Sequence, residues 1–478
     1  MHNELKKGRL IVVSNRLPVT LMKTAKSSYE LVPAAGGLVT AMIPVLKRSG
    51  GVWIGWAGNY AEEGVDARSL LCEESEPLAY ELAPVELCVR NYELYYKGFS
   101  NEVLWPLFHN LSIYCNFVPA YYEAFKAVNE KFALAVVDRV AEDDFVWIHD
   151  YHLINVGRCL REKNIKNNMG FFLHIPFPPA ETFRRMPWRR EIINAMLSYD
   201  LVGFQTDGDK ENFLDAVKVL GSEVVIEEQS EGVYVIETKE QHCSVGTFPI
   251  SIDFDEFSIP AGEEGVMRMM QEIKGEYAGQ KLMLGVDRLD YSKGIPHKLK
   301  AYRRLLELSP RLRKKVKLMQ IMIPSREDIA KYDNLKSEIE QIIGEINGRF
   351  SQPGWIPIQY CYCSLSREEL LAYYRASDVA LVTPLKDGMN LVAKEYCTAN
   401  IDNSGVLLLS EFAGAASALK EGALTVNPFD VDSMVSTMEK ALYMCEDEMQ
   451  ERMKKLRDKI KARDIYWWVD AFLKVAKA

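Results

Sequence analysis

The sequence predicts an α/β fold built on parallel sheets. Short apolar segments recur along the 478 residues, and each is almost continuously hydrophobic, as expected of strands buried on both faces of a parallel sheet. Longer segments with helical patterns separate them, and this alternation is typical of α/β proteins. Polar residues follow the apolar segments at their carboxyl ends, where open α/β sheets bind ligands.

The expected strands follow in chain order. Nine apolar segments are interpreted as strands: 9–15 (RLIVVSN), 145–150 (FVWIHD), 170–176 (GFFLHIP), 201–206 (LVGFQT), 281–288 (KLMLGVDR), 317–326 (KLMQIMIPSR), 379–384 (VALVTP), 405–411 (GVLLLSE) and 424–428 (LTVNP).

Three further elements have recognisable local patterns. The segment 358–365 (IQYCYCSL) is expected to be a strand with Cys361 and Cys363 on one face, because strand side chains alternate. Ser366 and Glu369 form a capping-box pattern that predicts the start of a helix. Residues 227–245 are expected to form a surface hairpin.

We expect two domains, because this number of strands is too large for a single sheet. The seam is placed at 246–257 (GTFPISIDFDEF), where Pro249 follows an apolar run and acidic, loop-like sequence begins. This predicts one domain over residues 1–247 and a second over 248–459.

Composition excludes several classes of protein. The net charge of -9 argues against a general nucleic-acid binder or a binder of anionic membranes, which needs a basic surface. No apolar run approaches the ~18 residues of a membrane span, and the N-terminus lacks a signal-peptide pattern. The nine cysteines include no CxxC pair, which favours a reducing compartment, and we expect a cytoplasmic protein.

Polar residues at the ends of the apolar segments predict the functional site. One such residue is explained by a helix cap. Together they favour two sheets that face a shared polar cleft. The set is Asn15, Arg16, Asp150, His174, Thr206, Arg288, Arg326, Asp387, Glu411 and Asn427.

Arg288 and Lys293 lie between an expected strand and an expected helix. Two cations beside a helix N-terminus suit a diphosphate, although a surface turn with solvated charges would have the same pattern. A Walker-type loop is absent and no G-x-G-x-x-G follows a strand, so nicotinamide and ATP chemistry lose their usual support.

Asp387 and Glu395 are separated by seven residues in TPLKDGMNLVAKEY (383–396). A carboxylate in the loop accepts sugar hydroxyls, and one on the helix accepts the two hydroxyls of a ribose. The backbone N–H groups of Gly388, Met389 and Asn390 at the helix start suit phosphate or sugar oxygens.

The first half offers weaker signals. Gly36 and Gly37 precede an expected helix and allow a ligand to approach the backbone, although a tight turn has the same pattern. His174 ends an apolar strand and is expected in the cleft. His149 and His152, with Asp150 between them, are spaced as His-x-x-His. A third ligand with ordered spacing is missing, so we expect no metal there.

An aromatic cluster is the last candidate. Tyr96, Trp105 and His109 are more typical of a hydrophobic core. Tyr and Trp nevertheless combine an apolar face with a hydrogen-bond donor, as a sugar-phosphate site requires. No G-x-S-x-G or H-E-x-x-H motif is found, so hydrolase chemistry has little support.

The motifs together resemble those of the trehalose-6-phosphate synthases, the retaining GT-B glycosyltransferase family 20. The resemblance extends from about Arg9 to IYWWVDAF (465–472). The segments that carry it are VVSNRLP (12–18), AGGLVTAM (35–42), SNEVLWPLFH (100–109), WIHDYHL (147–153), GFFLHIPFP (170–178), VDRLDYSKG (286–294), PSRED (324–328) and TPLKDGMNLVAKEY (383–396).

The resemblance implies two Rossmann-like domains around a central cleft, and transfer of glucose from a nucleotide-diphosphate glucose to glucose 6-phosphate with retention of the α configuration. The second domain would bind the donor, the first would bind the acceptor, and a C-terminal helix within 460–478 would pack back on the first. UDP-glucose is the default donor. Neither a metal nor another cofactor is expected.

The resemblance also implies residue roles. Catalytic roles fall to His174, Arg288, Lys293 and Asp387. Donor binding falls to Gly37, Arg288, Lys293, Asp387, Gly388, Met389, Asn390, Leu391, Val392 and Glu395. Acceptor binding falls to Arg16, Tyr96, Trp105, Asp150 and Arg326. The acceptor hydroxyl would attack from the face of the leaving group, whose phosphate would take the proton.

Two alternatives stay open at this point. One is a related synthase with another acceptor, such as a glucosylglycerol-phosphate synthase, and the other is a non-catalytic sensor of sugar phosphates. We expect no phosphatase domain, so that a separate trehalose-phosphate phosphatase would act on the product. The sequence does not choose the nucleotide, nor does it decide between a monomer and a homo-oligomer.

Overall fold

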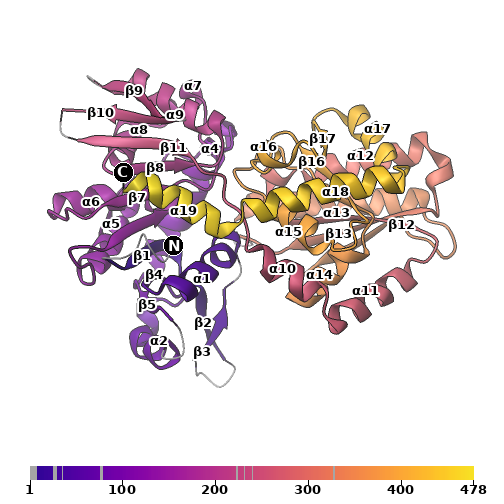
Figure 1. Ribbon diagram of the computed structural model, residues 1–478, viewed down its shortest axis with the longest axis horizontal. Helices are drawn as coiled ribbons and strands as arrows, with labels where there is room; N and C mark the ends of the chain where they lie inside the picture. Colours follow the sequence, from indigo (N-terminus) through magenta and orange to yellow (C-terminus); the bar gives the residue numbers. More distant parts are fainter. Residues whose placement is uncertain are drawn as a thin grey trace. The chain divides into compact units, whose positions relative to one another are not determined.

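The protein is described by a computed structural model that covers residues 8–24, 29–34, 36–75, 79–221, 224–230, 232–239, 241–326 and 329–477. It divides into two compact units, Met1–Ile250 together with Ile465–Ala478, and Ser251–Asp464. Each unit contains a large sheet with helices packed on it (Figure 1).

The first unit is built on a nine-stranded, mainly parallel sheet with the order β5-β4-β1-β6-β7-β8-β11-β10-β9. Strand β10, which lies between β11 and the edge strand β9, pairs antiparallel with both. A separate hairpin, β2–β3, follows β1. The strands are β1 (Leu10–Arg16), β2 (Val19–Lys23), β3 (Tyr29–Pro33), β4 (Val52–Trp56), β5 (Glu81–Pro84), β6 (Phe145–His149), β7 (Met169–Phe172), β8 (Leu201–Phe204), β9 (Val225–Ser230), β10 (Val233–Glu237) and β11 (His242–Thr247).

The helices of the first unit include a 13-residue π-helix, η2 (Tyr92–Leu104), which α3 and α4 flank directly. The α-helices are α1 (Gly37–Ser49), α2 (Ala67–Ser75), α3 (Val89–Asn91), α4 (Trp105–Phe108), α5 (Pro119–Val137), α6 (Val156–Glu162), α7 (Ala180–Phe183), α8 (Arg189–Met196), α9 (Asp207–Leu220) and α19 (Ile465–Ala476). Short 3₁₀ turns are η1 (Ala61–Glu63), η3 (Ser112–Tyr114) and η4 (Tyr151–Leu153).

The second unit has a six-stranded sheet of order β14-β13-β12-β15-β16-β17, in which every pair is parallel. Its strands are β12 (Lys281–Arg288), β13 (Val316–Ile323), β14 (Ile358–Tyr362), β15 (Val379–Val382), β16 (Val406–Ser410) and β17 (Leu424–Val426). Its helices are α10 (Phe254–Ala261), α11 (Glu264–Glu276), α12 (Ile295–Leu308), α13 (Ala330–Phe350), α14 (Arg367–Ala376), α15 (Leu391–Ala399), α16 (Ala416–Leu419), α17 (Val431–Leu442) and α18 (Glu446–Ala462), with 3₁₀ turns η5 (Tyr291–Lys293) and η6 (Pro310–Leu312).

Both sheets have the Rossmann order. In each, the first six strands of the sheet run 3-2-1-4-5-6 in chain order, so the winding reverses between β1 and β6 and between β12 and β15. Ligands of such sheets bind beyond the carboxyl ends of the strands at this reversal. The expected α/β class with two Rossmann-like parallel sheets is therefore confirmed, and so are the nine predicted strands, β14, the hairpin β9–β10 and the capping box of α14.

Strands β2, β3, β4 and β5 of the first unit were not predicted from the sequence. The β2–β3 hairpin and β5 are short, and β4 contains a glycine, which strands disfavour. Gly55 is required there because a Cβ would lie 2.7 Å from the Arg16 carbonyl carbon, where β1 is bulged beside β4. The close approach of two strands outweighs the local propensity.

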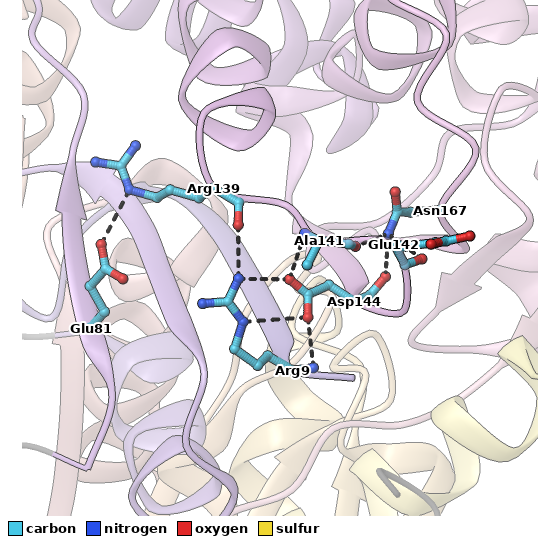
Figure 2. A network of polar contacts seen from close by, with 7 residues as sticks. All are labelled: Arg9, Glu81, Arg139, Ala141, Glu142, Asp144 and Asn167. Carbon is cyan, nitrogen blue, oxygen red and sulfur yellow. Dashed lines mark hydrogen bonds and ion pairs between the residues drawn. The ribbon is translucent and has the colours of Figure 1, made fainter. Parts of the chain in front are cut away.

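Charged residues at the amino ends of the first sheet are paired with one another (Figure 2). Asp144 accepts hydrogen bonds from Arg9 Nη2 at 2.9 Å, from the Arg9 backbone at 2.8 Å and from the Ala141 backbone at 2.9 Å. Burial opposes its ionisation, but these donors outweigh burial and lower the pKa of Asp144. Asn167 joins the same network through backbone carbonyls. These contacts hold the amino ends of the strands together. The candidate site lies at the opposite, carboxyl ends of the strands.

Candidate functional site

Two loops at the switch point of the second sheet are locked together. The loop after β12 passes through η5, and the loop after β15 leads to α15. Leu385 N–H donates to the Ser292 carbonyl at 2.7 Å. Gly294 has φ 67°, and a Cβ there would lie 2.5 Å from the Thr383 carbonyl oxygen, so only glycine fits this crossing.

Lys293 and Asp387 meet across these loops. Lys293 Nζ lies 2.5 Å from Asp387 Oδ2, and both side chains are largely buried. Asn390 Nδ2 donates to the same oxygen at 3.1 Å, and Met389 N–H donates to Asp387 Oδ1 at 3.3 Å. The predicted cation and the predicted loop carboxylate therefore form one cluster, which fixes both side chains before any ligand contact.

Backbone hydrogen bonds from a second loop, at Gly414 and Ala415, hold the loop 387–390 in place. Gly414 N–H donates to the Asp387 carbonyl at 2.8 Å, and Ala415 N–H donates to the Met389 carbonyl at 2.9 Å. Asn390 is the N-cap of α15 in a left-handed conformation, φ 62°. A Cβ on Gly414 would lie 1.7 Å from the Gly388 carbonyl oxygen, so the two backbones touch. The backbone of residues 387–390 is thus rigid at the start of a helix, as anion recognition requires.

Glu395 is the central residue of α15. Its Oε2 accepts a hydrogen bond from the Tyr374 hydroxyl at 2.9 Å. Burial raises the pKa of Glu395, and the Tyr374 hydrogen bond partly counteracts this effect. Leu391 is buried and Val392 is half-buried in the first turn of the same helix.

Arg288 is the last residue of β12, and Arg326 lies in the loop that follows the neighbouring strand β13. Arg288 is exposed at the end of β12. Arg326, with φ 53°, pairs with Asp290 at 3.2 Å and lies 2.6 Å from the Tyr332 hydroxyl. Its side chain is only 7% exposed. The structure thus places Arg326 in the second unit, beside the expected donor residues.

In the first unit, Arg16 lies against one end of a row of aromatic rings. The guanidinium carbon of Arg16 lies 4.5 Å from the Trp56 ring centroid, a cation–π contact. Tyr92 stacks on Tyr96 with centroids 5.0 Å apart, and Tyr96 stacks on His152 at 5.6 Å. The π-helix supplies both tyrosines, and π-helical geometry is often found at functional sites.

Asp150 and His174 follow β6 and β7. Asp150 has φ 72°, and its Oδ1 accepts the His174 backbone N–H at 3.2 Å. His152 Nδ1 lies 4.0 Å from Asp150 Oδ2. The His174 ring is buried, and burial lowers its pKa to about 3, so the imidazole is neutral. Asp150 is therefore oriented by the strand that carries His174.

Trp105 and Gly37 complete the predicted set in this unit. Trp105 is 5% exposed and packs against His109 at 4.2 Å and Tyr151 at 5.8 Å. Gly37 is the first residue of α1. Tyr151 precedes His152, so Trp105 and Tyr96 both contact the segment that follows Asp150.

Several residues that shape these clusters were not found from the sequence. In the second unit they are Asp290, Tyr332, Tyr374 and Gly414; in the first unit they are Trp56, Tyr92 and Tyr95, whose hydroxyl donates to Asn15 Oδ1 at 2.9 Å. Asp290 lies inside the DYSK segment that follows β12, and this position was the available signal. Trp56 is the last residue of β4, a strand that was not predicted. The sequence gives no such signal for Tyr332, Tyr374 and Gly414, because packing between segments far apart in the sequence brings them to these clusters.

Two kinds of feature are absent from the described residues. No group of three or more His, Cys, Asp or Glu side chains is placed to hold a metal ion. Among the described helices, none has the length and apolar character needed to span a membrane.

Comparisons with known proteins agree on one family. A family model described as "Glycosyltransferase family 20" matches residues 8–478. "Trehalose-6-phosphate synthase" of Mycobacterium avium is 40% identical over 97% of this chain and 94% of that protein. "Alpha,alpha-trehalose-phosphate synthase [UDP-forming] A" of Dictyostelium discoideum is 38% identical over 98% of this chain, which spans 62% of that relative.

A solved structure gives the same result. The crystal structure of an α,α-trehalose-phosphate synthase (UDP-forming) from Burkholderia xenovorans in complex with glucose 6-phosphate has a TM-score of 0.89 and 37% sequence identity. The match covers 98% of this chain and all of the other.

Proposed function

The chain belongs to glycosyltransferase family 20, and we propose that it makes α,α-trehalose 6-phosphate from UDP-glucose and glucose 6-phosphate. The observation that carries the proposal is the Lys293–Asp387–Asn390 cluster at the switch point of the second sheet. It combines a cation for a diphosphate with a carboxylate and an amide for sugar hydroxyls, at the start of α15.

The donor would bind the second unit. Arg288 and Lys293 would hold the diphosphate, and Asp387, Gly388, Met389 and Asn390 would hold the glucose. Leu391 and Val392 would lie near the nucleotide, and the Glu395 carboxylate would accept the ribose hydroxyls. The fixed backbone of residues 387–390 supports this assignment, because preorganised N–H groups need no rearrangement to meet a developing charge.

Acceptor binding would use Arg16, Tyr96, Trp105, Asp150 and Arg326. Cations suit the 6-phosphate, and the Asp150 carboxylate suits the sugar hydroxyls. Gly37 and His174 would approach the donor glucose. The cation–π contact of Arg16 with Trp56 supports a phosphate role, because it limits the positions that this cation can adopt.

In the reaction, a hydroxyl oxygen of glucose 6-phosphate forms a bond to the anomeric carbon of the donor while the bond from that carbon to the β-phosphate oxygen breaks. The hydroxyl proton passes to the departing phosphate oxygen, and the products are the disaccharide phosphate and UDP. Arg288 and Lys293 stabilise the charge that develops on UDP. Attack on the face of the leaving group retains the α configuration.

A cytoplasmic location and a separate phosphatase for the product belong to the same proposal. All cysteines whose side chains the structure describes are free thiols, which supports a reducing compartment.

The deciding experiment is a donor panel. The purified protein is incubated with glucose 6-phosphate and UDP-, ADP-, GDP- or TDP-glucose, nucleotide release is followed, and the product is identified by NMR. We expect UDP release together with the α,α-linked disaccharide phosphate. Product with glycerol 3-phosphate in place of glucose 6-phosphate would reassign the acceptor, and binding without turnover of any pair would indicate a sugar-phosphate sensor.

A further inference from the structure

Three buried polar side chains form a hydrogen-bonded row beyond β6, β7 and β8. His149 Nδ1 lies 3.1 Å from His174 Nε2, and Gln205 Nε2 lies 3.4 Å from His174 Nδ1. Gln205 Oε1 accepts the backbone N–H of Ile250 at 2.9 Å. His149, His174 and Gln205 are 0%, 2% and 3% exposed. The row therefore runs from a backbone amide to an imidazole without contact with solvent.

The backbone amide at one end determines which atom donates and which accepts in each hydrogen bond of the row. The Ile250 N–H can only donate, so the amide oxygen of Gln205 faces it and the NH₂ group faces His174. His174 Nδ1 must then accept, which leaves the proton of a neutral His174 on Nε2. That N–H donates to His149 Nδ1, so the proton of a neutral His149 lies on its own Nε2.

Burial keeps both rings neutral. It lowers the pKa of His174 to about 3, and burial together with the neighbouring His174 lowers the pKa of His149 far below its usual value. Aromatic rings line the row: Trp468 lies 6.3 Å from the His149 ring and 6.2 Å from the His174 ring, and Phe172 lies 4.8 Å from His174. His149 Nε2 has no hydrogen-bond partner among the described residues. Both rings thus have a single low-energy tautomer.

We infer that Gln205 and His149 are positioning residues, which hold His174 as the Nε2–H tautomer and in one ring orientation. The same arrangement fixes the strand end at His174, whose backbone N–H orients Asp150. For turnover the inference rests on the proposed function, in which His174 approaches the donor glucose and Asp150 binds hydroxyls of the acceptor sugar. Gln205 itself touches no proposed substrate and acts through His174.

The tautomer is read directly by NMR. In the full-length protein labelled with ¹⁵N-histidine, long-range ¹H–¹⁵N spectra distinguish a protonated ring nitrogen from one with a lone pair, and His149→Gln and His174→Gln assign the two rings. We expect His149 and His174 to show the Nε2–H pattern at pH 7.5. A wild-type His174 that carries its proton on Nδ1 overturns the inference.

Gln205→Met removes the amide donor and acceptor with little change in volume. We expect His174 to lose its single tautomer and kcat to fall roughly 10- to 100-fold, which is typical of losing a partner that orients a functional histidine, while the KM values for both substrates change less than about twofold. A His174 that keeps the Nε2–H pattern, or an unchanged kcat after the tautomer is released, contradicts the inference.

Gln241→Met is the matched control. Gln241 is also bonded to the backbone of the first unit, where its amide donates to the Leu197 carbonyl, but it lies outside the row. It should leave the tautomer and kcat unchanged even if it lowers stability. A wild-type protein that makes no disaccharide phosphate yet shows the expected tautomers would refute the proposed function alone.

Discussion

Each of two cations proposed to bind a phosphate is held by a carboxylate. Arg326 pairs with Asp290, and Lys293 pairs with Asp387. Such pairs keep long side chains in place, so less conformational entropy is lost when a ligand binds. A cation that is already positioned also stabilises developing charge without reorganisation. The partners Asp290 and Asp387 are therefore as much a part of the site as the cations.

Arg326→Ala should weaken use of the acceptor. Loss of a charge-assisted contact costs about 1.5–3 kcal/mol, so we expect the KM for glucose 6-phosphate to rise roughly 10- to 100-fold while the KM for the donor changes less than about twofold. Steady-state kinetics with each substrate varied will measure this. Arg303→Ala, at a half-buried arginine of α12, is the control. An effect confined to the donor would show that Arg326 serves the other substrate.

Lys293→Ala should impair the chemical step. Without Lys293 the leaving diphosphate loses a cation, and we expect kcat/KM to fall on the order of 100-fold, as when one preorganised donor is removed. The control is Lys300→Ala, an exposed lysine of the following helix α12. Near-normal turnover of the Lys293 variant is incompatible with the proposed leaving-group role.

The buried His174 should make stability depend on pH. Its pKa is about 3 in the folded protein against 6.5 ordinarily, so the unfolded chain takes up the proton first as the pH falls. The stability from burying the neutral ring is complete above pH 6.5 and is lost progressively below it, by up to about 1.4 kcal/mol per pH unit. Urea unfolding between pH 7 and pH 4.5 should show a shallower pH dependence for His174→Gln than for the wild type. Identical slopes would show that His174 is protonated in the fold.

At the scale of elements, the candidate donor site depends on two loops that touch. Nothing in the sequence around Gly414 predicts that it faces Gly388, because the contact joins segments after β15 and β16 that only the parallel pairing of these strands brings together. The start of α15 was predictable from Asp387 to Asn390, since a turn residue and a cap precede an apolar helix. The sequence therefore predicted the residues that begin α15, but it did not predict the distant residues that hold them in place.

Gly414→Ala tests this support. The added Cβ would collide with the Gly388 carbonyl, and shifting residues 387–390 should weaken binding of UDP-glucose by about tenfold or more, measured by calorimetry. Gly344→Ala is the control, because Gly344 lies in α13 with open space around it and should gain up to about 1 kcal/mol of stability. Unchanged affinity in the Gly414 variant would remove residues 387–390 from the donor site.

At the scale of the whole molecule, the last described helix completes a unit begun by the first strand. α19 belongs to the first unit although α18, directly before it, belongs to the second. Trp468 stacks on Trp147 at 4.8 Å and donates to the Phe248 carbonyl at 2.9 Å, and Phe472 stacks on Trp147 at 4.4 Å. The first unit therefore has its core completed by residues from the far end of the chain.

Trp468→Ala should therefore destabilise the first unit. Removing a fully buried tryptophan costs about 3–5 kcal/mol, and we expect an unfolding transition at lower urea concentration, followed by the fluorescence of the remaining tryptophans. Lys474→Ala, at an exposed position of α19, should change stability by less than about 0.5 kcal/mol. A loss no larger than that of the control would mean that α19 contributes little to the core.

The sequence by itself determined the α/β class, the nine apolar strands and the family, because buried parallel strands are continuously apolar and because functional side chains follow their carboxyl ends. Tertiary structure alone decided which partners hold those side chains. Asp290 for Arg326, Gly414 for Gly388 and Gln205 for His174 are joined by the order of the strands, which brings distant loops together. Hydrogen-bond direction and steric contact depend on distances of a few ångströms, and residue spacing along a chain does not encode them.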